Sequence, residues 1–148
     1  MGFLVRLQAG AVTTLSLFVD TSAWSLLFRR DHPAGDVHAA ELARALQAGD
    51  RIVSTGIVLQ ELLQGFHGPK SRSRLLERFS AIPLIVPDRQ DPVEAAQLRN
   101  QCRRKGIPVG TIDALLAQLC LRHDLILLTA DGDFLQLARH CPLRVWTP

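Results

Sequence analysis

The stretch SLFVDTSAW, residues 16–24, decides the fold, because in it an apolar run ends on a carboxylate. Leu17 to Val19 predict a buried strand over residues 16–20, and the residues after it predict a helix over 22–29. Asp20, at the junction, has two interpretations. It caps the helix, as Asp, Thr and Ser often do, or it faces a crevice where chemistry takes place.

The rest of the chain repeats this alternation of strand and helix. Further short runs rich in Leu, Ile or Val predict strands at 51–54, 83–86, 125–129 and 143–146. Helical patterns lie at 36–48, 56–67, 71–81, 91–105, 111–123 and 132–139. Strands buried on both sides and separated by helices predict an α/β fold of three layers, α/β/α, with a central parallel sheet. In such a sheet, ligands bind outside the carboxyl ends of the strands, where strand order reverses.

Composition bounds the class of protein. With 148 residues, of which 47% are hydrophobic and 21% charged, the chain suits one globular domain over 16–148, preceded by an extension at 1–15 without assigned function. The apolar runs are too short to span a bilayer. The cysteine count is three and no pair has metal-ligand spacing, which predicts reduced thiols in a cytoplasmic protein.

Four acids occupy the positions where this fold would bring them to one end of the sheet: Asp20, Glu61, Asp113 and Asp131. Taken alone, each acid has either a local structural explanation or an energetic cost. Asp113 suits the positive end of its helix, and Asp131 suits a turn. Glu61 lies on or beside an apolar stripe, where a carboxylate is costly unless it is paired or bound to a cation.

Four gathered carboxylates repel one another, so the fold would need a compensating cation. A set made only of oxygen donors predicts Mg²⁺, with Mn²⁺ as the alternative, held by all four acids. Ser22, Thr111 and Thr129 are expected to hold these carboxylates by hydrogen bonds; helix capping is an equal alternative for Ser22 and Thr111. Asp133 is interpreted as a turn or capping residue that also stands at the rim of the site.

With these residues in place, the chain resembles a PIN-domain ribonuclease, and within that family a VapC-type toxin of a toxin–antitoxin pair. The resemblance covers residues 16 to about 146. It is carried by four segments that occur in family order, VDTSAW, IVLQELLQGF, GIPVGTIDALLAQ and LLTADGDF. The acidic quartet of the family falls on Asp20, Glu61, Asp113 and Asp131.

The resemblance implies a PIN-like domain that acts as a magnesium- or manganese-dependent endoribonuclease and forms a homodimer. It also implies a cognate VapB-type antitoxin, and transfer or ribosomal RNA as the target. An antitoxin helix is expected to use a groove lined by Trp24 and Phe28, with a place in the core as the alternative for both residues. Lys70, Arg72 and Arg74 are the expected RNA contacts, and a second basic cluster lies at residues 103–105. For both clusters a solvated helix face is the alternative.

Two rival functions remain at this stage. A phosphatase with an aspartyl nucleophile would carry a second Asp two residues after the first, and Ser22 occupies that position. The other rival is a catalytically silent PIN-like module that binds RNA or protein. Such a module would normally have lost one of its acids, so the complete quartet favours the enzyme.

Overall fold

The computed structural model describes residues 3–6, 15–29 and 35–148. Within these residues a single sheet contains six strands, in the order β1-β6-β5-β2-β3-β4. All five strand pairs are parallel. The strands are β1 (Phe3–Arg6), β2 (Ser16–Val19), β3 (Arg51–Thr55), β4 (Leu84–Ile85), β5 (Ile126–Leu128) and β6 (Arg144–Thr147).

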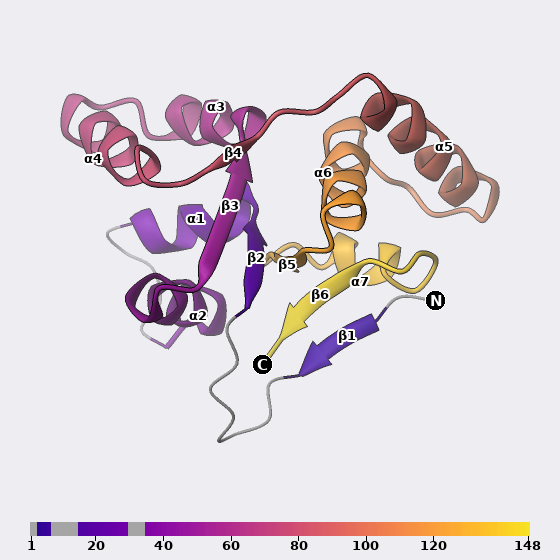
Figure 1. The fold of residues 1–148 in the computed structure, drawn as a ribbon, viewed down its shortest axis with the longest axis horizontal. Helices are drawn as coiled ribbons and strands as arrows, with labels where there is room; N and C mark the ends of the chain where they lie inside the picture. Colours follow the sequence, from indigo (N-terminus) through magenta and orange to yellow (C-terminus); the bar gives the residue numbers. More distant parts are fainter. Residues whose placement is uncertain (1–2, 7–14, 30–34) are drawn as a thin grey trace.

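Helices cover both faces of the sheet (Figure 1). On one side lie α1 (Thr21–Phe28), α2 (Val37–Ala48), α3 (Gly56–Gly65) and α4 (Pro69–Phe79). On the other side lie α5 (Gln90–Arg104), α6 (Thr111–Arg122) and α7 (Asp133–Leu137). The three-layer α/β/α architecture expected from the alternating sequence pattern is therefore confirmed.

Strand order reverses between β2 and β5, at the centre of the sheet. From β2 the chain proceeds outward through β3 to β4, and it then crosses back to β5 and continues to β6. Leu17 to Val19 of β2 pair with Ile126 to Leu128 of β5 in parallel register. Because both strands run in one direction, the residues that follow them, Asp20 and Thr129, meet at the same edge of the sheet.

The core is built on β2. Leu17, Phe18 and Val19 are fully buried, which is why this strand reads as a continuous apolar run. Each such side chain contributes about 1.5–3 kcal/mol through removal from water. A rigid strand at the centre of the sheet therefore carries the carboxylate that follows it.

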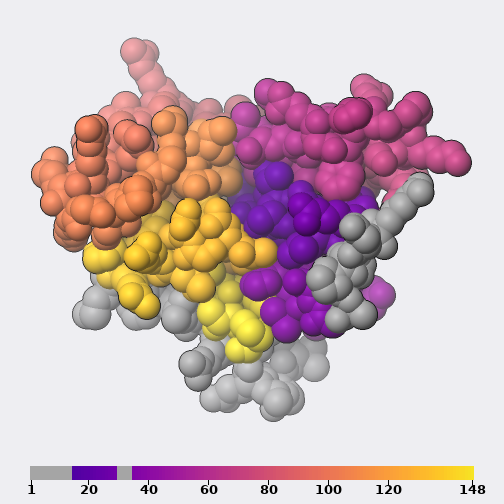
Figure 2. Space-filling view, turned by 180° about the vertical axis from the view of Figure 1, so that it is seen from behind, coloured from indigo at the N-terminus to yellow at the C-terminus, as the bar shows by residue number. Residues whose placement is uncertain are grey.

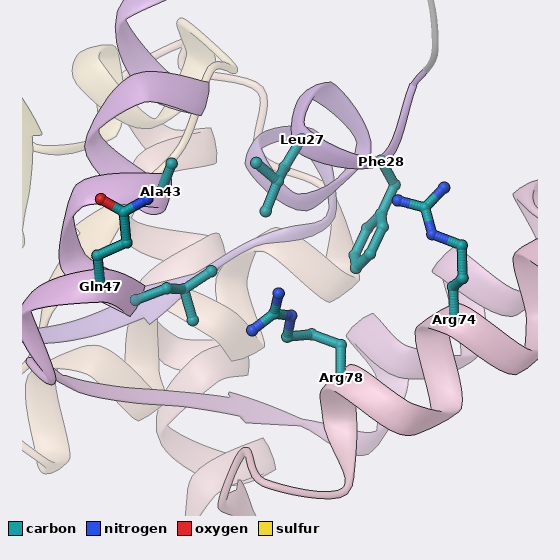
Figure 3. A pocket seen from close by; sticks show the side chains of 7 residues that line it. Leu27, Phe28, Ala43, Gln47, Arg74 and Arg78 are labelled. Atoms are coloured by element: carbon teal, nitrogen blue, oxygen red, sulfur yellow. The ribbon is translucent and has the colours of Figure 1, made fainter.

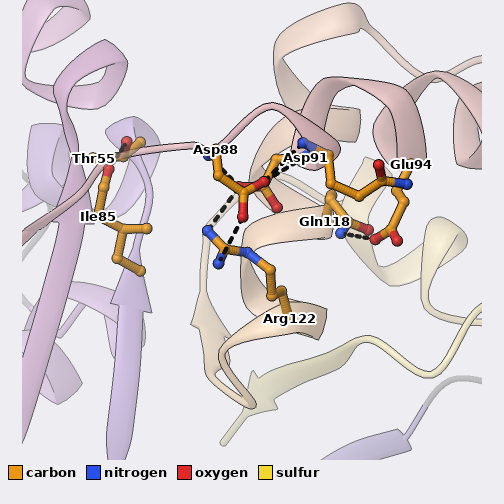
Figure 4. A network of polar contacts seen from close by, with 8 residues as sticks. Thr55, Ile85, Asp88, Asp91, Glu94, Gln118 and Arg122 are labelled. Carbon is orange, nitrogen blue, oxygen red and sulfur yellow. Dashed lines mark hydrogen bonds and ion pairs between the residues drawn. The ribbon is translucent and has the colours of Figure 1, made fainter.

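A network of polar contacts joins α5 to α6 (Figure 4). Asp91 in the first turn of α5 is fully buried, accepts from the Asp88 amide at 2.8 Å and pairs with Arg122 of α6 at 2.7 Å. Burial would raise the pKa of Asp91, but the Asp88 amide and the Arg122 guanidinium outweigh it and lower the pKa below 3.8. Gln118 of α6 also donates to Glu94 of α5.

Part of the predicted N-terminal extension, residues 1–15, contributes a strand to the sheet. Phe3–Arg6 form β1, which pairs with β6 from Arg144 to Thr147. Residues 1–2 and 7–14 lie outside the described ranges, so the division into an extension and one domain stays a prediction. The three cysteines, Cys102, Cys120 and Cys141, are buried and free. Throughout the described ranges, every helix is too short or too polar to cross a membrane.

Candidate active site

Asp20 follows β2 and combines both roles considered for it. Its Oδ1 accepts from the Ala23 amide at 3.1 Å, which makes it the N-cap of α1. The same oxygen accepts from Ser22 Oγ at 2.7 Å, and Oδ2 accepts from Thr129 Oγ1 at 2.6 Å. The side chain is thus held in one orientation with only 4% of the residue exposed.

The pKa of Asp20 is raised above its ordinary value. Burial is the main cause, and the negative charge of Asp131 adds to it. The hydrogen bonds from Thr129, Ser22 and Ala23 act in the opposite direction because they stabilise the charged form. Keeping the Asp20 side chain charged at this buried position therefore costs free energy. A helix cap at the surface would not carry this cost.

The loop at residues 130–131 is connected to Asp20 through two hydroxyl groups. The Asp131 amide donates to Thr129 Oγ1 at 3.0 Å, while the neighbouring Ala130 amide donates to Ser22 Oγ at 2.9 Å. Ser22 and Thr129 thereby link the loop after β5 to the start of α1. Asp131 Oδ1 accepts from the Asp133 amide at 2.9 Å, which orders the turn that begins α7.

Glu61 reaches the same region from α3. It is half-buried, and its Oε1 accepts from Thr21 Oγ1 at 2.8 Å. Thr21 is a supporting residue that the sequence did not predict. Its place directly after Asp20 is the only available signal, and it becomes informative only once α3 is known to lie against α1.

Asp113 lies in the first turn of α6, where it faces the other acids. The pKa of Asp113 is raised to about 6, first by burial and then by repulsion from Asp131, Asp20, Asp133 and Glu61. Figure 2 shows the segments that carry these residues meeting on one face, with the indigo start of α1 between magenta α3, orange α6 and the yellow chain after β5. Four elements far apart in sequence thus contribute to one acidic centre, formed by Asp20, Glu61, Asp113 and Asp131.

Within the described ranges, no three side chains of metal-binding type stand close enough to enclose an ion on their own. Magnesium commonly keeps several waters and is held by only one or two carboxylates together with substrate phosphates. The oxygen-only donor set and the mutual repulsion felt by Asp113 both fit such an ion.

A family model of the PIN domain matches residues 17–140. The chain belongs to the PIN-domain family. It is 32% identical over 126 residues to VapC ribonuclease Mb1587 of Mycobacterium bovis, with 83% of this chain and 92% of that protein covered. The same identity and coverage relate it to ribonuclease VapC11 of Mycobacterium tuberculosis. Both of these relatives are named as VapC ribonucleases.

Solved PIN-domain structures share the fold. VapBC-1 from nontypeable Haemophilus influenzae superposes with a TM-score of 0.67 at 21% identity, covering 90% of this chain and 97% of that one. DNA-bound VapBC from Salmonella typhimurium gives 0.67 at 24% identity, covering 88% and 96%. VapC20 of Mycobacterium tuberculosis, described as a Sarcin-Ricin loop cleaving toxin, gives 0.60 at 23% identity, covering 82% and 94%.

The other two residues predicted for the site of this PIN domain, Thr111 and Asp133, are both exposed. Thr111 is exposed at the start of α6, whose N-cap is Gly110, and no hydrogen bond joins Thr111 to an acid in the described part of the chain. Asp133 is exposed beside Asp131 and contributes to the repulsion on Asp113. Its role at the rim of the site stays a prediction.

The prediction that Trp24 lines a surface groove is wrong. Trp24 is fully buried and packs between two rings, with centroids 5.9 Å from Phe28 and 4.9 Å from Phe79. Its position in the first turn after Asp20 turns it toward the core. Phe28, one turn further along α1, does line a groove (Figure 3).

This groove lies between α1, α2 and α4, and we call it the Phe28 groove. Its volume is about 290 Å³, and Arg74 and Arg78 of α4 stand along one side of it, opposite Ala43 and Gln47 of α2 (Figure 3). Arg74 lies over the Phe28 ring at 6.0 Å. Of the expected RNA contacts, Lys70 and Arg72 are exposed on the same helix.

Proposed function

We propose that this PIN domain is a divalent-metal-dependent endoribonuclease and the toxin of a VapBC-type toxin–antitoxin pair. The observation that carries the proposal is the acidic centre itself. Burial of Asp113, together with repulsion from the neighbouring carboxylates, raises its pKa to about 6, and this arrangement adds nothing to the stability of the fold. The ribonuclease names of the relatives support the same activity.

Asp20, Glu61, Asp113 and Asp131 would hold Mg²⁺ or Mn²⁺. When bound, such an ion polarises a phosphate and lowers the pKa of a bound water. Ser22 and Thr129 fix the Asp20 carboxylate, and Thr21 fixes Glu61, so these hydroxyl groups set the orientation of the acids before substrate arrives. Asp113, the half-buried member of the four on α6, also lines an open groove.

A VapB-type antitoxin is the proposed partner. Several solved relatives are described as VapBC complexes, which supports a protein partner for this chain. The Phe28 groove offers apolar side chains beside Arg74 and Arg78, and these features fit an amphipathic antitoxin segment that carries acidic residues. We further propose a homodimer acting in the cytoplasm, with transfer or ribosomal RNA as substrate.

The rival function is a catalytically silent PIN-like module that binds RNA or protein. The complete set of four acids and the three hydroxyl groups that orient them favour the enzyme, because a binding module needs neither. The two functions differ in one measurable property, which is turnover.

The test is cleavage of total cellular RNA by the purified protein. We expect new internal 5′ ends in the presence of Mg²⁺ or Mn²⁺, no cleavage in EDTA, and full recovery when the ion is added back. Cleavage that persists in EDTA would contradict the metal-dependent mechanism. Binding of RNA without cleavage under all of these conditions would support the silent module.

A further inference from the structure

A second groove opens directly onto the acidic centre, and we call it the α5–α6 groove. Its volume is about 680 Å³. Asp113 and Asp133 line it together with two arginines of α5, Arg99 and Arg103. The loop at residues 107–110, which connects α5 to α6, completes the wall. Positive and negative side chains thus share one groove beside the site where we place the chemistry.

We propose that the α5–α6 groove holds the RNA backbone next to the phosphodiester that is cleaved, with Arg99 and Arg103 contacting neighbouring phosphates. This inference rests on the proposed function, since it names how that site receives its substrate. Arg99 is not among the RNA contacts expected from the sequence, whereas Arg103 belongs to the second basic cluster, at residues 103–105. Both would act as positioning residues.

The charge distribution is the first argument. An RNA strand that reaches the acidic centre carries a phosphate on every nucleotide, and the carboxylates repel each of them. A bound cation compensates at the phosphate that is attacked, but it does not compensate along the strand. Arg99 and Arg103 supply positive charge in the groove through which the flanking nucleotides must pass.

The geometry of Arg99 is the second argument. Its Nε donates to the Val109 carbonyl at 2.8 Å, and the residue is half-buried. In the part of the chain that the structure describes, the two terminal amino groups of this guanidinium have no hydrogen-bond partner. The side chain is therefore fixed at one nitrogen and available at the others, and this arrangement lowers the entropy cost of gripping a phosphate.

The same hydrogen bond sets the position of Arg99 relative to the acids. Val109 precedes Gly110, the N-cap of α6, and Asp113 lies in the first turn of that helix. The position of a phosphate held by Arg99 is consequently set relative to the start of α6 and therefore relative to the carboxylate of Asp113. This coupling is what a positioning contact needs.

The basic cluster on α4 lacks these properties. Arg74 lies over the Phe28 ring and lines the Phe28 groove, to which no member of the acidic centre contributes. Lys70, Arg72 and Arg74 therefore stay untested as RNA contacts. Charge alone does not distinguish the two clusters, whereas a shared groove with Asp113 does.

The experiment measures binding of a mixed-sequence, fluorescently labelled 2′-O-methyl oligoribonucleotide, which resists cleavage, in Mg²⁺ at a series of salt concentrations. The variants are Arg103→Gln, which removes the charge, and Arg99→Lys, which keeps the charge but replaces the planar guanidinium group by a single ammonium group. Arg104→Gln is the matched control, because Arg104 is the exposed neighbour of Arg103 and does not line the groove. Thermal unfolding confirms that each variant is folded.

We expect Arg103→Gln to weaken binding about 3- to 10-fold and to reduce the slope of log Kd against log salt by about 0.7, the value for one phosphate contact on a single strand. Arg99→Lys should weaken binding with the slope unchanged. Arg104→Gln should match the wild type. Identical salt slopes for wild type, Arg103→Gln and Arg104→Gln would overturn the inference.

Failure of the groove assignment can be distinguished from failure of the proposed function. If the wild-type protein cleaves RNA while Arg103→Gln binds as the wild type does, only the groove assignment fails. If the wild type cleaves no RNA, the proposed function fails, and the salt titration still decides whether the groove holds phosphates. A loss of binding in the Arg104→Gln control equal to that in Arg103→Gln would also count against the groove.

Discussion

Asp20 shows how one residue can serve both the fold and the chemistry. Its carboxylate caps α1 through the Ala23 amide and also accepts hydrogen bonds from Ser22 and Thr129. A cap needs one acceptor oxygen, yet here both oxygens are bound and the residue is almost completely buried. The extra hydroxyl contacts offset part of the cost of burying the charge. They leave a carboxylate whose orientation is set by its neighbours.

The charge of Asp113 predicts a pH dependence in the metal-free protein. Its pKa rises from 3.8 to about 6 on folding, so the native state binds this proton more tightly than the unfolded chain does. The free energy of unfolding should therefore fall as pH rises from about 4 to about 6. Asp113→Asn abolishes this loss. We expect the variant to be more stable than the wild type by about 1 kcal/mol near pH 7, a value discounted for partial exposure.

Urea unfolding in EDTA at several pH values checks this expectation. Below about pH 4 both proteins carry a neutral side chain at position 113, so their stabilities should converge there. A wild type that is more stable than Asp113→Asn near neutral pH would mean that repulsion does not dominate at this residue.

At the scale of elements, the pair α5 and α6 depends on a buried ion pair. Arg122→Gln leaves the Asp91 carboxylate buried with the Asp88 amide as its remaining strong partner. We expect the free energy of unfolding to fall by about 3 kcal/mol, because the charge stays buried after its partner is removed. Since the pKa of Asp91 is lowered on folding, this contribution is present above pH 3.8 and is lost as pH falls through the native value.

The control for this prediction is Arg144→Gln. Arg144 pairs at 2.6 Å with Asp124, whose side chain is 91% exposed. Such a surface pair contributes less than about 1 kcal/mol. Chemical denaturation with an unchanged m-value compares the two variants, and equal losses would show that the α5–α6 network is not the stronger contact.

The Phe28 groove carries a prediction about inhibition. Arg78→Glu reverses a charge that lines the groove on α4, so we expect an antitoxin with acidic residues to inhibit about tenfold less tightly. RNA cleavage without antitoxin should be unaffected. Titration of nuclease activity against antitoxin measures this, with Arg139→Glu as the control, because Arg139 is exposed and does not line the groove. Equal weakening by both substitutions would indicate general electrostatic attraction instead of a seat in the groove.

Sequence reasoning predicts most elements here, and its errors have physical causes. Buried parallel strands such as Leu17 to Val19 read as continuous apolar runs, so they are found directly. β1 was not predicted, because Phe3–Arg6 becomes a strand only by pairing with β6 at the other end of the chain. Trp24 was misplaced because both the core and a groove accept an aromatic residue, and only packing against Phe79 decides between them.

In the candidate site, too, some residues could be predicted from local sequence, whereas others depend on packing between distant elements. The ends of β2 and β5 are local features, so residues such as Asp20 and Asp131 could be selected from sequence. Which basic cluster stands beside them depends on where two helices pack on the sheet. That information is non-local, and for this reason Arg99 was overlooked in favour of the cluster on α4.

At the scale of the whole molecule, we expect a two-fold dimer. The described surface exposes large apolar side chains, among them Val86 at 80%, Val93 at 47% and Val37 at 45%. Association would remove part of this area from water. Multi-angle light scattering at micromolar concentration should give twice the chain mass of 16.3 kDa. A mass equal to one chain across that concentration range would contradict the dimer.

The central claim is that the acidic centre performs metal-dependent cleavage of RNA, and Asp20→Asn tests it most directly. The amide is nearly isosteric with the carboxylate, so the fold should survive while the charge is lost. Asp124→Asn is the matched control: Asp124 has a φ of 54°, a conformation that Asn tolerates, and lies away from the centre.

The measurement is the rate of RNA cleavage in Mg²⁺ by the wild type and both variants, with circular dichroism to confirm folding. The account predicts a loss of more than about a hundredfold for Asp20→Asn and no change for Asp124→Asn. A folded Asp20→Asn protein that cleaves RNA at the wild-type rate would contradict it.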